Sequence, residues 1–179
     1  MRKPISITAL FLFLLTLTAL LPPILRADET QLEYKLKAAF LLNFAKFTSW
    51  PESVLREGEF KLCILGDNPF GPAFAGIEQK TVAALPIKLI QTNDLDQARQ
   101  CNMIYVSKSE SDKLEQIITA ISADPTLMVS DIEDFAEKGG GVELATVNRR
   151  LGFNINQTQT QKAGLKINAS LLDLANEVF

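Results

Sequence analysis

Apolar and polar positions along the chain alternate in a way that predicts successive strands and helices. Short apolar runs, several rich in branched residues, are typical of strands buried in a sheet. Such runs occur at residues 60–65, 86–90, 102–107, 126–130, 142–147 and 151–155. The last two are separated by a tight turn, so they are expected to pair as an antiparallel hairpin.

Helices are predicted between these strands. Helical spacing or turn residues suggest them at residues 30–49, 70–77, 109–123, 132–137, 157–163 and 170–179. The clearest is 109–123, where Ser109 and Asp112 resemble a capping box and an apolar stripe follows. Strands alternating with helices predict an α/β fold: a three-layer sandwich with a mostly parallel sheet, helices on both faces and an antiparallel edge hairpin.

The helix at 30–49 is apolar on more than one side. Its main stripe, with Leu36, Phe40 and Phe47, is expected to pack in the core, whereas the residues off this stripe are expected to dock. Aromatic side chains dominate binding hot spots, so the aromatic end of the helix is included in the docking surface. The predicted interface, for a regulated partner or a second copy of the chain, comprises Tyr34, Leu41, Phe44, Phe47 and Trp50.

The N-terminus has the layout of a secretory signal peptide. Arg2 and Lys3 precede an uncharged apolar run at 5–21, two prolines follow, and Ala27 offers a small residue before a cleavage point. An uncleaved membrane anchor is the alternative, because the run is close to spanning length. Cleavage after Ala27 is favoured, so the expected organisation is a signal peptide, 1–27, and one domain, 28–179, in the periplasm without membrane insertion.

Charge argues against nucleic acid as a partner. The chain carries a formal charge of −3, and residues 1–27 contain three basic and no acidic residues, so cleavage leaves −6. A negative surface repels phosphate backbones. The remaining 152 residues are enough for a single domain with a hydrophobic core.

Two cysteines, Cys63 and Cys101, remain in the predicted exported domain. In an oxidising compartment such a pair favours a disulfide, and closing this loop contributes about 4 kcal/mol on the chain-entropy model, less any strain. Two buried free thiols are the alternative. The spacing is not that of a thioredoxin-like redox site.

The chain contains no histidine, which excludes histidine-dependent hydrolase mechanisms and histidine zinc sites. The glycines at 139–141 follow a predicted helix instead of a strand, so they do not form a dinucleotide-binding fingerprint. No catalytic residue, metal or cofactor is therefore assigned.

One ligand cleft remains as an alternative, at the carboxyl ends of the parallel strands. Its candidate residues are Asp67, Ser107, Ser130 and Asp131. Two aspartates after strands more often fix turns or cap helices, so a ligand-binding sensor acting through a different membrane partner is the second hypothesis, and an enzyme the third.

Several segments carry a resemblance to a known family. They are the run at 39–47 with Trp50-Pro51 after it, 62–71, 101–107 with Ser109-Glu110, 129–131, Phe135-Ala136, 139–141, 153–156 and 163–167. In this order they resemble the YfiR family over nearly all of the predicted mature chain. The sequence departs from the family in lacking a later cysteine pair, and in reading Phe153-Asn154-Ile155-Asn156 where the family has a glutamate at the second position.

The resemblance implies a periplasmic protein that restrains a membrane-bound diguanylate cyclase by contacting its periplasmic part, and so lowers cyclic-di-GMP signalling and biofilm formation. It also implies that Cys63 and Cys101 occupy the paired-cysteine positions of the family. A redox switch built on the later pair is not expected here.

Overall fold

The computed structural model describes residues 24–147 and 150–179. Residues 1–23 of the predicted signal peptide, and the turn residues 148–149 of the predicted hairpin, lie outside the described part. The chain divides into two compact units, Met1–Leu32 and Glu33–Phe179. Helix α2 (Ile24–Lys46) begins in the first unit and ends in the second, which holds the sheet and the cores described next.

An eight-stranded sheet organises this second unit, in the order β10-β8-β7-β6-β5-β2-β4-β3. In chain order the strands are β2 (Phe60–Leu65), β3 (Thr81–Val82), β4 (Leu85–Thr92), β5 (Met103–Val106), β6 (Leu127–Ser130), β7 (Val142–Val147), β8 (Arg150–Ile155) and β10 (Glu177–Val178). Strands β4, β2, β5, β6 and β7 run parallel, and β8 pairs antiparallel with β7. The predicted three-layer α/β fold with an edge hairpin is confirmed.

The strands are buried because both faces of the sheet are covered. In β2, Leu62 and Ile64 point into one core, whereas Cys63 and Leu65 point into the other. The same alternation in β5 and β6 makes these strands apolar throughout instead of amphipathic.

The first face is covered by the second half of α2 and by the segment from Ala163 to α7 (Ala169–Leu172). In the helix before this segment, α6 (Gln157–Lys162), the Gln159 side chain donates to the Ser122 carbonyl at the end of α5 (Leu114–Ile121), at 2.9 Å. Aromatic rings dominate this core, with Phe44 against Phe153 at 5.0 Å and Phe70 against Tyr105 at 4.7 Å between centroids. A small antiparallel sheet, β1 (Thr48–Ser49) with β9 (Lys166–Ile167), ties the end of α2 to this layer.

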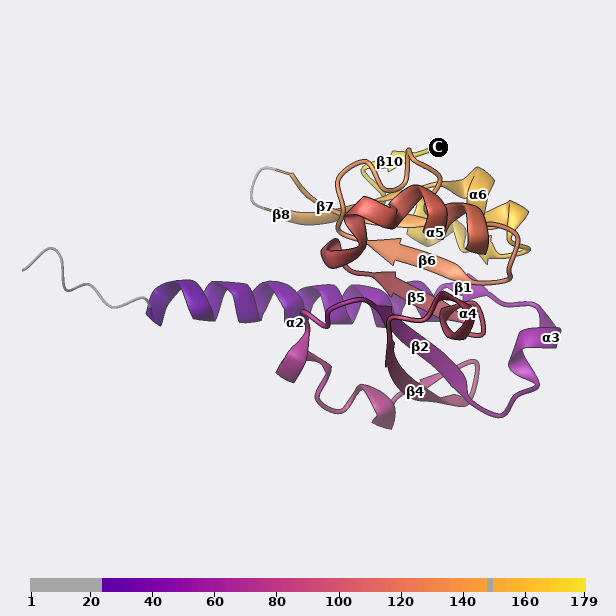
Figure 1. The fold of residues 1–179 in the computed structure, drawn as a ribbon, viewed down its shortest axis with the longest axis horizontal. Coiled ribbons are helices and arrows are strands. Elements are labelled where there is room, and N and C mark those ends of the chain that lie inside the picture. The colour runs from indigo at the N-terminus through magenta and orange to yellow at the C-terminus, as the bar shows by residue number, and fades with distance from the viewer. Residues whose placement is uncertain (1–23, 148–149) are drawn as a thin grey trace, which may run out of the picture. The chain divides into compact units, whose positions relative to one another are not determined.

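The second face carries α4 (Leu95–Ala98) and α5 (Leu114–Ile121), which lie on the near side of the sheet in Figure 1. Leu114, Ile117 and Ile121 fill this smaller core, as the stripe of the predicted helix requires. Its first part, Lys108–Lys113, is a 3-10 turn, and Ser109 accepts a hydrogen bond from the backbone N–H of Asp67 at 2.9 Å instead of capping α5.

A disulfide joins Cys63 and Cys101 within this second core, with 6.1 Å between their Cα atoms. It links β2 to the segment that precedes β5. The favoured reading of the two cysteines agrees with this geometry, and no free cysteine remains in the part of the chain that the structure describes.

Three predicted helices were wrong or too long. Residues 70–77 hold two 3-10 turns, Gly71–Phe74 and Ile77–Gln79, and residues 132–137 form turns. The last predicted helix, 170–179, is only α7 followed by β10. The tail leaves helical geometry because it pairs with β8: Asn176 N–H donates to the Phe153 carbonyl at 2.8 Å, and Phe179 N–H to that of Ile155 at 2.9 Å.

The remaining short helix, α3 (Glu52–Leu55), follows Pro51. No helix among the described residues is both long enough and apolar enough to cross a lipid bilayer.

Candidate functional site: an apolar groove beside a buried ion pair

Large apolar side chains are exposed at several places on the second unit. Leu174 is 71% exposed and Val147 50%. Others exposed to a similar degree are Leu36, Phe47, Val178 and Phe179. They come from α2 and the residue that follows it, the end of β7 and the C-terminal tail. Surface of this kind is a candidate for contact with another protein.

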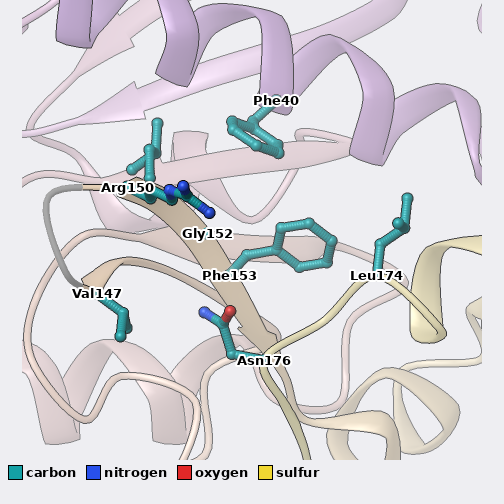
Figure 2. Close-up of a pocket in the computed structure, with 8 residues that line it drawn as sticks. Phe40, Val147, Arg150, Gly152, Phe153, Leu174 and Asn176 are labelled. Carbon is teal, nitrogen blue, oxygen red and sulfur yellow. The ribbon is translucent and has the colours of Figure 1, made fainter.

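A hollow of about 690 Å³, named here the apolar groove, is lined by two of these exposed residues, Val147 and Leu174 (Figure 2). Its lining comes from α2, the β7–β8 hairpin and the C-terminal tail: Phe40, Val147, Arg150, Leu151, Gly152, Phe153, Leu174 and Asn176. Figure 2 shows Phe40 on the helix opposite Phe153 on β8, with Leu174 to one side. The Phe40 and Phe153 rings meet edge to face with centroids 5.6 Å apart, so α2 forms one wall and β8 the other.

Gly152 lets the C-terminal tail lie close against β8. A Cβ atom at this position would stand 2.6 Å from Nδ2 of Asn176, closer than a side chain can be tolerated without movement. The tail is fixed there by backbone hydrogen bonds, including that of Asn176 to Phe153. The groove is therefore built partly by the tail.

The exposure of α2 differs from the predicted pattern. Leu41 and Phe44, predicted to dock, have no exposed surface, so they are core residues and not interface residues. Phe47 is 44% exposed, and Leu36, predicted to lie in the core, is 47% exposed. The reason is that α2 carries two apolar stripes. The one with Ala38, Leu41 and Phe44, spaced three residues apart, faces the first core, where Phe44 packs on Phe153, and the stripe of Leu36 and Phe47 is turned away from it.

The other two predicted interface residues are half-buried. Tyr34 packs edge to face on Phe70, with 5.5 Å between ring centroids. Trp50 packs on Phe60 and donates its indole N–H to the Ala45 carbonyl at 2.8 Å. Of the predicted interface set, only Phe47 is freely exposed, and Phe40, which was assigned to the core, lines the groove.

A buried polar cluster lies one helical turn before Phe40. Lys37, only 3% exposed, places its ammonium 2.6 Å from Asp131 Oδ2 and 2.6 Å from Glu33 Oε1. Tyr105, fully buried, donates its hydroxyl to Asp131 Oδ1 at 2.6 Å. Lys37 also lies 4.7 Å from the centroid of the Tyr34 ring. Both oxygens of the Asp131 carboxylate are thus occupied.

Hydrogen bonding keeps this cluster charged. Burial raises the pKa of Asp131, but hydrogen bonds from Lys37 and Tyr105 outweigh it and hold that pKa below its ordinary value. Burial lowers the pKa of Lys37, yet Asp131 and Glu33 together raise it above its ordinary value. Burial, and then the Asp131 charge, raise the pKa of Tyr105 far above its ordinary value. At neutral pH the cluster therefore holds an ion pair and a neutral phenol.

The predicted ligand cleft is only partly assembled. Asp67, Ser107, Ser130 and Asp131 all follow or end the parallel strands β2, β5 and β6, as predicted. Ser130 donates its hydroxyl to the Val106 carbonyl at 2.7 Å, and Asp67 is exposed and caps a turn through its backbone. Asp131 lines a cavity of about 380 Å³, together with Lys37 and Lys108.

Because Asp131 is already saturated, this cavity offers no free carboxylate from the predicted set. Lys37, which completes the cluster, was missed from the sequence. The available signal was a lysine in the apolar part of a helix, four residues after Glu33. In residues 24–147 and 150–179, no group of three or more metal-ligating side chains is placed to hold an ion.

Comparisons with known proteins match this chain in sequence and in fold. The YfiR/HmsC-like family model, DUF4154, matches residues 34–176. No curated protein matches the chain. A crystal structure of a conserved domain protein from Vibrio cholerae O1 biovar El Tor str. N16961 is similar in fold, with a TM-score of 0.50 at 11% identity. The alignment covers 72% of this chain and 57% of that one, so this chain spans little more than half of its length.

Proposed function

This chain belongs to the YfiR/HmsC-like family, and from that premise we propose that it binds and represses the periplasmic part of a membrane-bound diguanylate cyclase. At the level of the family it is a periplasmic regulator of cyclic-di-GMP signalling. The finer proposal is that the chain acts by contact alone, without catalysis, and that its release raises cyclic-di-GMP output. Repression of this kind requires only a difference in affinity between two states of the partner.

The observation that carries this proposal is the apolar groove. Exposed Leu174 and Val147 stand at its rim, and the rings of Phe40 and Phe153 lie within it. An aromatic floor with apolar rims is the usual composition of a binding hot spot. Arg150 adds a charged side chain to the lining, which suits the polar rim of an interface.

The predicted docking helix is kept in this proposal, but with different residues. Phe40 and Phe47 of the aromatic cluster are available for contact, whereas Leu41 and Phe44 are not. A second copy of the chain remains the other occupant considered for the same surface. A dimer would have to leave the groove before the cyclase binds, and its presence would be seen as a concentration-dependent mass in solution.

A small-ligand sensor remains the second candidate, supported only by the 380 Å³ cavity beside Asp131. Its lining is acidic, with Glu133, Asp134 and Glu143 in addition to the cluster residues. A ligand that favours the folded state must raise the melting temperature. Screening small cations and zwitterions by thermal shift tests this candidate. If none of them raises the melting temperature, the ligand sensor is rejected and docking is the remaining proposal.

The test in cells compares two variants that each add one negative charge. Leu174→Asp places a carboxylate at the rim of the groove, and Thr119→Asp places one on exposed α5, on the opposite face of the sheet. In a strain lacking the protein but carrying its cyclase, wild type and Thr119→Asp are expected to lower cyclic-di-GMP, and Leu174→Asp is not. Equal repression by both variants would overturn the proposed site, and no repression by wild type would overturn the function.

A further inference from the structure

We infer that the buried Lys37–Asp131 ion pair is a register lock, which holds α2 in the position where Phe40 completes the apolar groove. The consequence for partner binding rests on the proposed function, whereas the lock itself concerns the chain alone. Lys37 and Phe40 are three residues apart on one rigid helix, about one turn. Any slide or rotation of α2 that moves one must move the other.

Apolar contacts alone leave the register of this helix weakly defined. Ala38, Leu41, Phe44 and Ala45 pack α2 onto the first core. Apolar burial is non-directional and depends mainly on the area removed from water. A shifted helix could bury similar area with a different residue facing β8, and Phe40 would then leave the groove.

The ion pair is directional and depends on position. Glu33 lies on α2 and moves with Lys37, so the register is defined by the contact of Lys37 with Asp131 at 2.6 Å, and Asp131 is held on its other side by Tyr105 at 2.6 Å. Displacing the helix by a single turn, about 5.4 Å, would break the buried Lys37–Asp131 pair and leave Asp131 with the exposed Lys108 at 3.6 Å as its nearest cation. Leaving one member of a buried pair uncompensated is far more unfavourable than replacing both with apolar groups. The pair therefore selects one register, which is the best-attested role of buried polar contacts.

Asp131 immediately follows β6, a fully buried strand inside the sheet, so the lock ties α2 to the sheet. Groove residues Phe153 and Leu151 lie on β8, which belongs to the same sheet. One contact between helix and sheet thus fixes the distance between the two walls of the groove. Lys37 and Asp131 are positioning residues in this sense and need not touch the partner.

The test replaces both charges, so that no buried charge is left alone. In Lys37→Met/Asp131→Asn the methionine keeps the length of the lysine and the asparagine keeps an acceptor for Tyr105. The amides of residues 36–46 are expected to exchange with deuterium about tenfold faster or more, relative to the amides of β2 and β5, because local opening of α2 becomes easier. The affinity for the purified periplasmic domain of the cyclase should fall about tenfold if the competent register drops to about a tenth of the population.

Two controls separate the lock from simple loss of stability or charge. Arg99→Met/Asp124→Asn removes a largely exposed pair at 2.8 Å, far from α2 in the sequence, and should change neither readout. Ile121→Val lowers stability from the second core, and should not speed exchange of α2 relative to the strands. Should the double variant fail to fold, Tyr105→Phe removes one hydrogen bond to Asp131 and must give a smaller change in the same direction.

Unchanged relative exchange of residues 36–46 in the double variant and in Tyr105→Phe would overturn the lock, whatever the partner does. Faster exchange with unchanged affinity would overturn its role in docking. If wild type itself does not bind the cyclase domain, the proposed function fails, while the exchange result still decides the lock.

Discussion

Two adjacent turns of α2 contact the rest of the protein differently, one through a buried ion pair and the other through a partly uncovered aromatic ring. At Lys37 the helix contributes a buried charge that is paired with Asp131, after β6, and with Glu33 of α2 itself. At Phe40 it contributes a ring that touches Phe153 on one side and leaves a hollow of about 690 Å³ on the other. The Lys37 ammonium already has its hydrogen-bonding partners, whereas Phe40 leaves apolar surface available for a further contact.

This difference indicates that one turn of α2 contributes to stability and the next turn contributes to binding. A saturated buried cluster contributes to the position and stability of the helix, and its loss should be seen in unfolding experiments. An incompletely covered apolar surface contributes little to stability, and its loss should be seen in binding experiments. Variants at each turn should therefore change either the free energy of unfolding or the affinity for the partner, but not both equally.

The largest expected effect is that of Asp131→Ala. This change leaves the Lys37 ammonium with Glu33 alone and the buried Tyr105 hydroxyl without its acceptor, so the free energy of unfolding should fall by about 3–5 kcal/mol. Chemical denaturation measures it. The control, Asp124→Ala, removes an acid from the largely exposed Arg99 pair and should lower stability by about 1 kcal/mol or less. Equal losses of unfolding free energy in the two variants would mean that the buried cluster contributes no more to stability than an exposed ion pair.

Next comes the disulfide, which lies on the other face of the sheet from both turns of α2. Cys63→Ser and Cys101→Ser should each lower the free energy of unfolding by about 2–4 kcal/mol, and the two values should agree because either change opens the same loop. Partner affinity should stay as in wild type under conditions where the variants remain folded. If either cysteine variant stayed folded but lost affinity for the partner, the shape of the groove would depend on the whole fold and not on the position of α2 alone.

A smaller effect is expected from pH, which changes the charge of the Lys37–Asp131 pair and leaves the apolar contacts of Phe40 unchanged. The folded-state pKa of Asp131 lies below its ordinary value of 3.8, so its contribution is present above pH 3.8 and is lost as the pH falls through that lower value. Lys37 has a pKa above 10.5, so its contribution is present below pH 10.5 and is lost as the pH rises through the raised value.

Asp131→Asn should therefore remove part of the acid slope in a plot of unfolding free energy against pH, whereas Leu174→Ser, in the groove, should leave the slope unchanged. Denaturant titrations at a series of acidic pH values give this plot. A slope identical to wild type in Asp131→Asn would contradict the assignment of the charge.

The smallest expected effect on stability is that of Gly152→Ala. The new methyl group must displace the exposed Asn176 side chain, which can rotate away, so the loss should be about 1 kcal/mol or less. Partner affinity should nevertheless fall, because Asn176 lines the groove, and Gly152→Ala/Asn176→Ala should recover part of it. Thermal unfolding and a binding isotherm measure the two quantities. Unchanged affinity in Gly152→Ala would show that the partner does not reach this end of the groove.

Most of the fold was predictable because its determinants are local. The buried strands are short apolar runs between turn residues, and the stripe of Leu114, Ile117 and Ile121 needs only helical spacing to be recognised. The paired cysteines were predictable from compartment and number. The tail was not, because residues 170–179 satisfy a helical pattern and only the neighbouring edge of β8 makes them extended.

The candidate site was predictable only in part, for the same physical reason. The aromatic content of α2 pointed to the correct helix, but α2 carries two apolar stripes, and only the packing on β8 shows that the stripe with Ala38, Leu41 and Phe44 faces the core. Asp131 was identified by its position after β6, but its partner Lys37 lies 94 residues away in the sequence. Pairing across such a distance is set by the fold and leaves no local pattern.

The central claim is that the apolar groove is where this protein holds its partner, and one paired measurement tests it most directly. Wild type, Leu174→Asp and Thr119→Asp are each titrated against the purified periplasmic domain of the cyclase, and each is melted alone. Leu174 and Thr119 are both exposed, so the three melting temperatures should agree closely. The predicted result is that Leu174→Asp alone loses affinity, by about tenfold or more. Affinities that agree for all three proteins would contradict the claim.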